Sequence, residues 1–144
     1  MARQPRVDKQ DWDDVLAYRP AGQQRAEVRD RLAASGVTPE TLSRVLADGG
    51  DELNARATMA AKDWADPFGG PLAAALLAAE VSALSAHLNS RAANVRARAV
   101  EDLLDEVSVV AVASHLGVSR QKVYELGRAR LGANFIDRVP WRKP

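Results

Sequence analysis

The chain has 144 residues, the size of one ordinary domain or of two small ones that share a core. Hydrophobic residues make up 47% and charged residues 27%, the balance of a soluble globular protein. Alanine occurs 27 times and aromatic residues only seven times, which favours closely packed helices over a β-sheet. The absence of cysteine excludes disulfides, thiol chemistry and zinc sites with thiolate ligands.

Targeting and metal-binding signals are also missing from the sequence. No stretch approaches 18 uninterrupted apolar residues, and residues 1–14 lack the apolar run of a signal peptide. The two histidines lie 28 residues apart, which leaves little with which to build a histidine metal site. We therefore expect an all-α cytoplasmic protein with no membrane contact, no metal and no cofactor.

The net charge of +1 hides an uneven distribution of charge along the chain. Residues 1–70 hold ten basic and twelve acidic side chains, whereas residues 108–144 hold seven basic and two acidic ones. A cationic end on an otherwise acidic chain suits contact with an anionic partner. A basic C-terminal tail without a ligand would give the same count.

Four short helices are expected before residue 66. The first follows Asp11 and stops before Pro20, and the second runs from about Gln23 to Ser35. Thr38 and Pro39 are typical of an N-cap and a first helical position, and Asp51 is expected to cap a fourth helix that extends through Trp64. The expected core positions are Trp12, Val15, Leu16, Val28, Leu32, Leu42, Val45 and Leu46, followed in the fourth helix by Leu53, Ala57, Ala60 and Trp64.

The run Asp66–Pro71 is the strongest break in the chain, and it separates an N-terminal helical region, residues 1–70, from a long helix over 71–90. The apolar seam Leu77, Val81, Leu84 and Leu88 predicts either a homodimer interface or packing on the N-terminal helices. A break or a bend is expected at Asn89-Ser90. A third region, residues 91–144, then begins with a helix whose inward residues are Val95, Ala99, Val100, Leu103 and Leu104.

The most informative segment, Ser108–Leu126, contains two short apolar-periodic stretches separated by Gly117-Val118-Ser119. Small Ala113 suits the point where two helices cross, and Gly117 suits a turn with positive φ. Ser108 and Ser119 stand where each helix needs an N-cap. The residues expected to be buried together are Val112, Ala113, Leu116, Val118, Val123 and Leu126.

The stretch from Val109 to Arg128 resembles the helix-turn-helix of DNA-binding transcriptional regulators. As in those proteins, the small residue Ala113 is followed four residues later by Gly117, and Gly117 is followed six residues later by the aliphatic Val123. With the preceding helix, the resemblance covers residues 92–130 and implies a C-terminal tri-helical helix-turn-helix domain within a multi-helix bundle. Ala111 departs from the pattern, because many relatives carry there a glutamate that completes a capping box. Residues 1–90 resemble no family.

That resemblance implies a sequence-specific double-stranded DNA-binding protein, a small regulator or repressor that reads the major groove with the helix over residues 119–128. At about 100° per residue, an inward Val123 leaves Gln121, Tyr124, Glu125 and Arg128 outward. Glutamine suits adenine and arginine suits guanine, and Glu125 is expected to pair with Lys122 or Arg128. The candidate DNA-binding residues are Ser119, Arg120, Gln121, Lys122, Tyr124, Arg128, Arg138, Arg142 and Lys143.

Two flanking features extend this interpretation. Gly127 is expected to end the recognition helix, and the apolar residues Phe135, Ile136 and Trp141 predict that the basic C-terminal segment folds back on the domain. Upstream, the stretch Gly36–Leu42 repeats the spacing of Gly117–Val123. It is either a second DNA-binding corner or an ordinary helical corner.

Catalysis is not expected, because adjacent acidic pairs such as Glu101 and Asp102 diverge on a helix instead of converging on a substrate. The alternative function is a protein-interaction module, like an antitoxin or anti-activator. In that case residues 1–70 bind a protein partner, and DNA binding is secondary or absent. Salt-dependent retention on DNA would separate the two functions.

Overall fold

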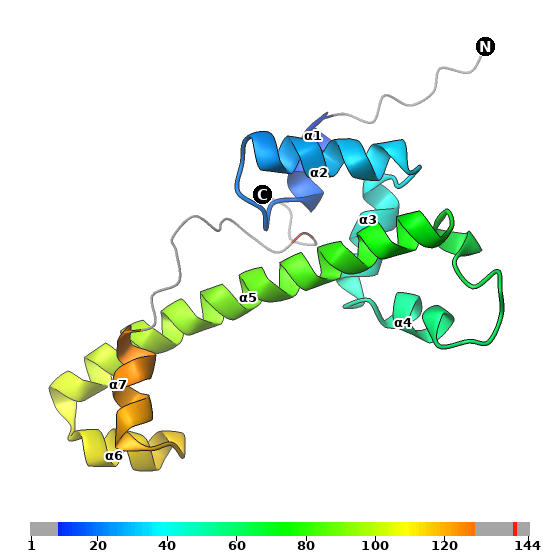
Figure 1. Cartoon of the computed structure of the whole chain (residues 1–144). Helices are drawn as coiled ribbons and strands as arrows, with labels where there is room; N and C mark the ends of the chain where they lie inside the picture. The colour runs from blue at the N-terminus through cyan, green and yellow to red at the C-terminus, as the bar shows by residue number, and fades with distance from the viewer. Residues whose placement is uncertain (1–8, 129–139, 141–144) are drawn as a thin grey trace. The chain divides into compact units, whose positions relative to one another are not determined.

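The computed structural model describes residues 9–128 and Pro140. The helices, coloured by residue number in Figure 1, are α1 Lys9–Val15, α2 Gln23–Ala34, α3 Pro39–Ala47, α4 Asp51–Ala57, a 3₁₀ turn Asp66–Phe68, α5 Pro71–Glu106, α6 Val109–Leu116 and α7 Arg120–Arg128. The expected all-α class is confirmed, and no strand occurs within the described residues. The chain divides between Ser85 and Ala86 into two compact units, which we call unit 1 and unit 2.

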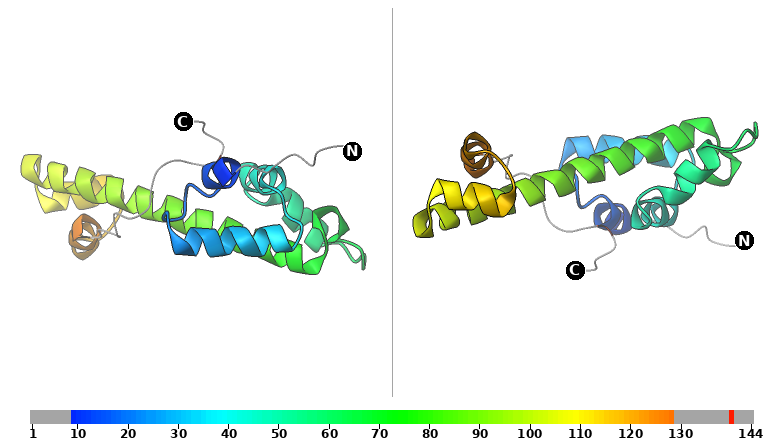
Figure 2. Two further views of the ribbon diagram at one scale, coloured as in Figure 1. Left: turned by 90° about the horizontal axis from the view of Figure 1, so that it is seen from above. Right: turned by 90° about the horizontal axis from the view of Figure 1, so that it is seen from below.

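Unit 1 is a bundle in which α1 to α4 gather around the N-terminal half of α5, as the two views of Figure 2 show. Its core joins side chains from all five helices and from the 3₁₀ turn, which contributes Phe68. The core positions expected in the first three helices and Leu53 are buried, whereas Ala57 and Ala60 are exposed and Trp64 is half-buried. The apolar spacing of the sequence therefore predicts the inner faces of α1, α2 and α3 correctly, but it predicts only Leu53 on α4, because that helix ends at Ala57.

The helix ends of unit 1 agree with the sequence at α3 and differ at α4. Thr38 caps α3, its Oγ1 accepting a hydrogen bond from the Thr41 amide at 3.2 Å. The capping carboxylate of α4 belongs to Asp48, not to Asp51, and it accepts from the amides of Gly50 (2.8 Å), Asp51 (3.0 Å) and Glu52 (3.2 Å). Gly49 and Gly50 both have positive φ, 68° and 82°, which folds the chain back so that Asp48 reaches these amides. Helix α4 is also shorter than expected and ends at Ala57.

A buried polar cluster joins the end of α1 to α5. The Glu80 carboxylate accepts two hydrogen bonds from Arg19, from Nε and Nη2 at 2.7 Å each, and a third from the Tyr18 hydroxyl at 2.7 Å. The Glu80 side chain is 5% exposed. Burial, followed by the nearby negative charge of Glu80, raises the pKa of Tyr18. Because a buried carboxylate is costly unless it is paired, this cluster fixes Arg19 and Tyr18 against α5.

Helix α5 runs without interruption from Pro71 to Glu106, so the helix does not break at Asn89-Ser90. In unit 2 its buried residues are His87, Ala93, Ala97 and Val100. Val95 is 71% exposed and Ala99 is also exposed, although both were expected to face inward. The reason is geometric, because five residues rotate an α-helix by about 140°, so Val95 and Val100 lie on different faces.

The apolar seam of α5 packs within the chain. Leu77 and Leu84 are buried in the core of unit 1, and Val81 packs partly against it, whereas Leu88 is 38% exposed. Of the two alternatives left open by the sequence, packing on the N-terminal helices therefore holds for the first three seam residues. A dimer cannot use Leu77 and Leu84 as its interface while this core is intact.

Helix α5 is also long and apolar enough, by length and composition, to cross a membrane, with a mean hydropathy of 1.4 over its most apolar 18 residues. A third of that window is buried inside the protein. Leu77 and Leu84 lie in the core, and Glu80 binds Arg19 and Tyr18. These contacts are those of a helix that packs in a protein core.

Candidate nucleic-acid interface

Helices α6 and α7 meet at a tight corner whose backbone geometry follows from three residues. Ser108 caps α6, its Oγ accepting from the Ala111 amide at 3.2 Å, and Ser119 caps α7, its Oγ accepting from the Lys122 amide at 3.1 Å. Between them Gly117 has φ 68° and ψ 33°, the left-handed conformation that ends α6. Ser108 forms its cap although Ala111 cannot supply the return bond of a capping box.

A backbone hydrogen bond from the Val118 amide to the Ala113 carbonyl, 3.0 Å, closes the corner. Behind it lies a small core formed by α5, α6 and α7, with Val100, Val112, Ala113, Val123 and Leu126 all at most 8% exposed. Leu103, Leu104, Val109 and Val118 are partly buried against this core. The three helices thus share one apolar centre within unit 2.

One expected core residue is misplaced, since Leu116 is 42% exposed. It lies on the same side of α6 as Val112, one turn further along. The buried positions Val112 and Ala113 mark where α7 crosses α6, so the last turn of α6 extends past the crossing and Leu116 remains uncovered. The expected burial of Val112, Ala113, Val123 and Leu126 is confirmed, and Val118 is half-buried.

The outer face of α7 is polar and exposed. Every described residue that the sequence proposes for DNA contact is exposed: Ser119, Arg120, Gln121, Lys122, Tyr124 and Arg128. The Tyr124 side chain is 49% exposed. We call these six residues the α7 face. The remaining three candidates, Arg138, Arg142 and Lys143, lie outside the described residues, as do Phe135, Ile136 and Trp141.

The α7 face carries a net positive charge, because Arg120, Lys122 and Arg128 outnumber the neighbouring Glu125. The Lys122 Nζ lies 3.7 Å from the Glu125 Oε2, with both side chains about half exposed, so the expected pairing of Glu125 is with Lys122. Such an exposed pair contributes little stability, and it reduces the repulsion that a lone carboxylate would exert on an approaching phosphate. The Arg128 Nε donates to the Tyr124 carbonyl at 3.2 Å, which holds the guanidinium along the helix.

Gly127 does not end α7, which continues to Arg128. A Cβ added at Gly127 would meet the Val100 Cγ1 at 3.3 Å, which is a crowded contact. The glycine therefore lets α7 approach α5 closely instead of terminating the helix. A glycine inside an amphipathic helix pattern is itself the signal of such an approach, and the sequence interpretation missed it.

The upstream corner between α2 and α3 has the same backbone pattern as the α6–α7 corner. Gly36 has φ 86°, the Val37 amide donates to the Leu32 carbonyl at 3.0 Å, and Thr38 caps α3. Its exposed face differs in chemistry, since Arg44 on α3 pairs with Glu52 at 3.8 Å. Arg31, which corresponds to the buried Val112, is exposed. The two corners therefore share a turn but not a cationic outer face.

Within residues 9–128, no group of three or more potential metal-binding side chains gathers. No family model, curated protein or solved structure matches this chain. The functional conclusion therefore depends on the geometry of α6 and α7 and on the chemistry of the α7 face.

Proposed function

We propose that this chain is a sequence-specific double-stranded DNA-binding protein, a small transcriptional regulator without catalytic activity, that reads the major groove with α7. The observation that carries the proposal is the α6–α7 corner. Val123 and Leu126 anchor one side of α7 in a three-helix core, while the exposed side chains of residues 119–128 are mostly polar and include three basic residues and one acidic residue. A helix held in this way by a second helix has the arrangement of DNA-reading helices in groove-binding regulators.

The α7 face offers contacts of two kinds. Gln121 and Arg128 have the head groups that pair bidentately with adenine and guanine. Among the described residues, Arg128 uses only its Nε, in the bond to the Tyr124 carbonyl. Ser119, Arg120 and Lys122 lie in the first turn, where side chains and backbone amides favour a phosphate. Tyr124 suits a phosphate or a thymine methyl group.

A homodimer stays a prediction of the proposed function. One recognition helix contacts only a few base pairs, so regulators of this kind commonly bind a two-fold symmetric site as dimers. Because Leu77 and Leu84 are buried in unit 1, a dimer of the intact fold would need another surface. The mass of the free protein in solution and the symmetry of its selected site would test this prediction together.

The experiment that tests the proposal separates residues that read bases from residues that bind phosphate. A preferred site is selected from random duplexes, and variants are titrated against that site and a scrambled one. Gln121→Ala and Arg128→Ala should lose about 1–3 kcal/mol on the selected site and much less on the scrambled one. Arg142→Ala and Lys143→Ala should weaken both sites alike. The exposed Arg44→Ala on α3 is the matched control and should change neither affinity.

The opposite pattern would contradict the assignment. If the C-terminal variants change sequence preference and the α7 variants do not, the basic tail is the reading element, and the α7 face serves another partner.

The alternative function, a protein-interaction module, has its own support in unit 1. That unit is a compact bundle with a separate core, and the 70 N-terminal residues carry two more acidic than basic side chains. Absence of any salt-dependent DNA binding would favour that alternative.

A further inference from the structure

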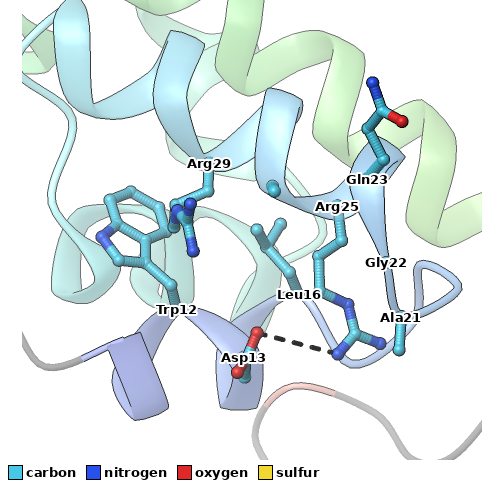
Figure 3. Close-up of a pocket in the computed structure, with 9 residues that line it drawn as sticks. Trp12, Asp13, Leu16, Ala21, Gly22, Gln23, Arg25 and Arg29 are labelled. Atoms are coloured by element: carbon cyan, nitrogen blue, oxygen red, sulfur yellow. Dashed lines mark ion pairs between the residues drawn. The ribbon is translucent and has the colours of Figure 1, made fainter.

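Unit 1 contains a cavity of about 410 Å³ between α1 and α2. Its lining includes two arginines of α2, Arg25 and Arg29, together with Trp12 and Asp13 of α1 and Leu16, which directly follows α1. Figure 3 shows both arginines pointing from α2 toward α1. A volume of this order is typical of sites for small organic ligands.

The two arginines form an unusual arrangement. They lie four residues apart, so their like charges are neighbours on one helix face, which is destabilising on its own. Both side chains are also largely buried, with 12% of Arg25 and 25% of Arg29 exposed. Charged groups withdrawn from water in this way require compensation by anionic or hydrogen-bonding partners.

Protein partners within the described residues use only part of the hydrogen-bonding capacity of the two guanidinium groups, and the nitrogens left over remain accessible to solvent. Arg25 donates from Nε and Nη2 to the Arg19 carbonyl, and its Nη1 lies 3.9 Å from the Asp13 Oδ1, beyond hydrogen-bond distance. Arg29 donates from Nε to the Asp30 Oδ1 at 3.2 Å. Among the described residues, the Nη1 of Arg25 and both Nη nitrogens of Arg29 therefore make no hydrogen bond.

Apart from Asp13 and Gln23, whose Nε2 donates to the Glu27 Oε1 at 3.1 Å, the remaining lining is apolar. Leu16 and Ala26 contribute aliphatic surface, and Trp12 contributes an indole, although its side chain as a whole is only 5% exposed. Two arginines and one aspartate give the lining a net charge of +1. The complementary ligand therefore carries one negative charge on an apolar body.

We propose that this cavity binds a small organic monoanion with a flat apolar body, of the class of aromatic carboxylates. The carboxylate accepts hydrogen bonds from the terminal nitrogens of Arg29 and from the Nη1 of Arg25, while the ring lies against Trp12 and Leu16. Charge-assisted bonds to a guanidinium fix the carboxylate, and the apolar contacts select the ring. The site is independent of the proposed DNA binding, because none of its lining residues belongs to unit 2.

The test is a titration of the full-length ¹⁵N-labelled protein with sodium benzoate, followed by two-dimensional NMR in the absence of nucleic acid. Benzoate should produce saturable shifts in the millimolar range at the Trp12 indole N–H and at the amides of Gly22 and Ala26. Benzyl alcohol, which lacks the charge, and acetate, which lacks the ring, should each bind with an affinity lower than that of benzoate by about tenfold or more.

Variants decide whether the arginines carry the binding. Arg29→Gln should weaken benzoate binding about tenfold or more, whereas Arg31→Gln, an exposed position on the same helix, should leave it unchanged. Arg25→Gln should weaken it as well, and the amide spectrum of each variant reports whether the bundle is folded. If Arg25→Gln does not fold, Arg29→Gln decides alone. The proposal is overturned if benzoate gives no saturable shifts near Trp12, if benzyl alcohol binds equally well, or if both Arg29→Gln and Arg31→Gln have the same effect.

Discussion

Replacement of Glu80 by alanine should destabilise unit 1 by about 3 kcal/mol. The carboxylate is 5% exposed and accepts three hydrogen bonds of 2.7 Å, two from Arg19 and one from Tyr18. Removal of one partner of a buried ion pair typically costs about 3–5 kcal/mol, because the other charge remains unpaired. The Arg19 side chain is 27% exposed and regains some hydration in the variant, which places the cost at the lower end of that range.

The assay is urea unfolding followed by tryptophan fluorescence, since Trp12 and Trp64 both lie in unit 1. Trp141 is replaced by phenylalanine in every protein compared. The matched control is Glu40→Ala, which removes an exposed carboxylate from α3. In a double-mutant cycle, adding Arg19→Ala to Glu80→Ala should cost much less than Arg19→Ala does alone. A loss of less than about 1 kcal/mol for Glu80→Ala, or additive effects in the cycle, would refute this account of the buried cluster.

Two further predictions concern the buried phenol and the α6–α7 corner. Burial and the charge of Glu80 raise the pKa of Tyr18 above its usual 10.0. The buried phenol therefore contributes fully to the free energy of unfolding below pH 10.0, and this contribution is lost as the pH rises further. Urea midpoints of the parent protein should therefore fall relative to those of Tyr18→Phe above pH 10, and parallel curves would contradict this. Ala113→Leu should cost about 1–3 kcal/mol in thermal unfolding and weaken DNA binding, because Ala113 lies where α6 and α7 cross. A variant that melts and binds like the parent would mean that the crossing point is elsewhere.

Local features of the fold could be predicted from the sequence. Thr38-Pro39 marks the start of α3, and Gly117 marks the end of α6, because each feature depends on a backbone requirement of one or two neighbouring residues. The inward positions of α7, Val123 and Leu126, follow from helical periodicity alone.

Features that depend on distant contacts could not be predicted in this way. Glu80 lies 61 residues from Arg19 and 62 from Tyr18, and no local pattern indicates that the three meet. The buried face of α5 in unit 2 depends on which of its residues α6 and α7 cover, so that Val100 is buried and Val95, about 140° away on the helix, is exposed. The exposure of Leu116 likewise depends on where α7 crosses α6.

For the candidate interface, the sequence predicted which side of α7 is exposed, and the structure agrees for all six candidate residues that it describes. Helical periodicity suffices for this prediction because the strongly apolar side of α7 must face the core, which leaves the opposite side exposed. The close approach of Gly127 to Val100 and the pairing of Glu125 specifically with Lys122 needed the structure, since both depend on side-chain positions.

The most direct test of DNA reading by α7 is the salt dependence of affinity for a selected duplex and for its scrambled counterpart. Fluorescence anisotropy across a range of salt concentrations gives the slope of log affinity against log salt for each duplex. Five to seven phosphate contacts predict a slope of about −4 to −6, with the selected site bound more tightly than the scrambled one at every salt concentration. An affinity that is independent of salt, or no binding to any duplex, would contradict the proposed function.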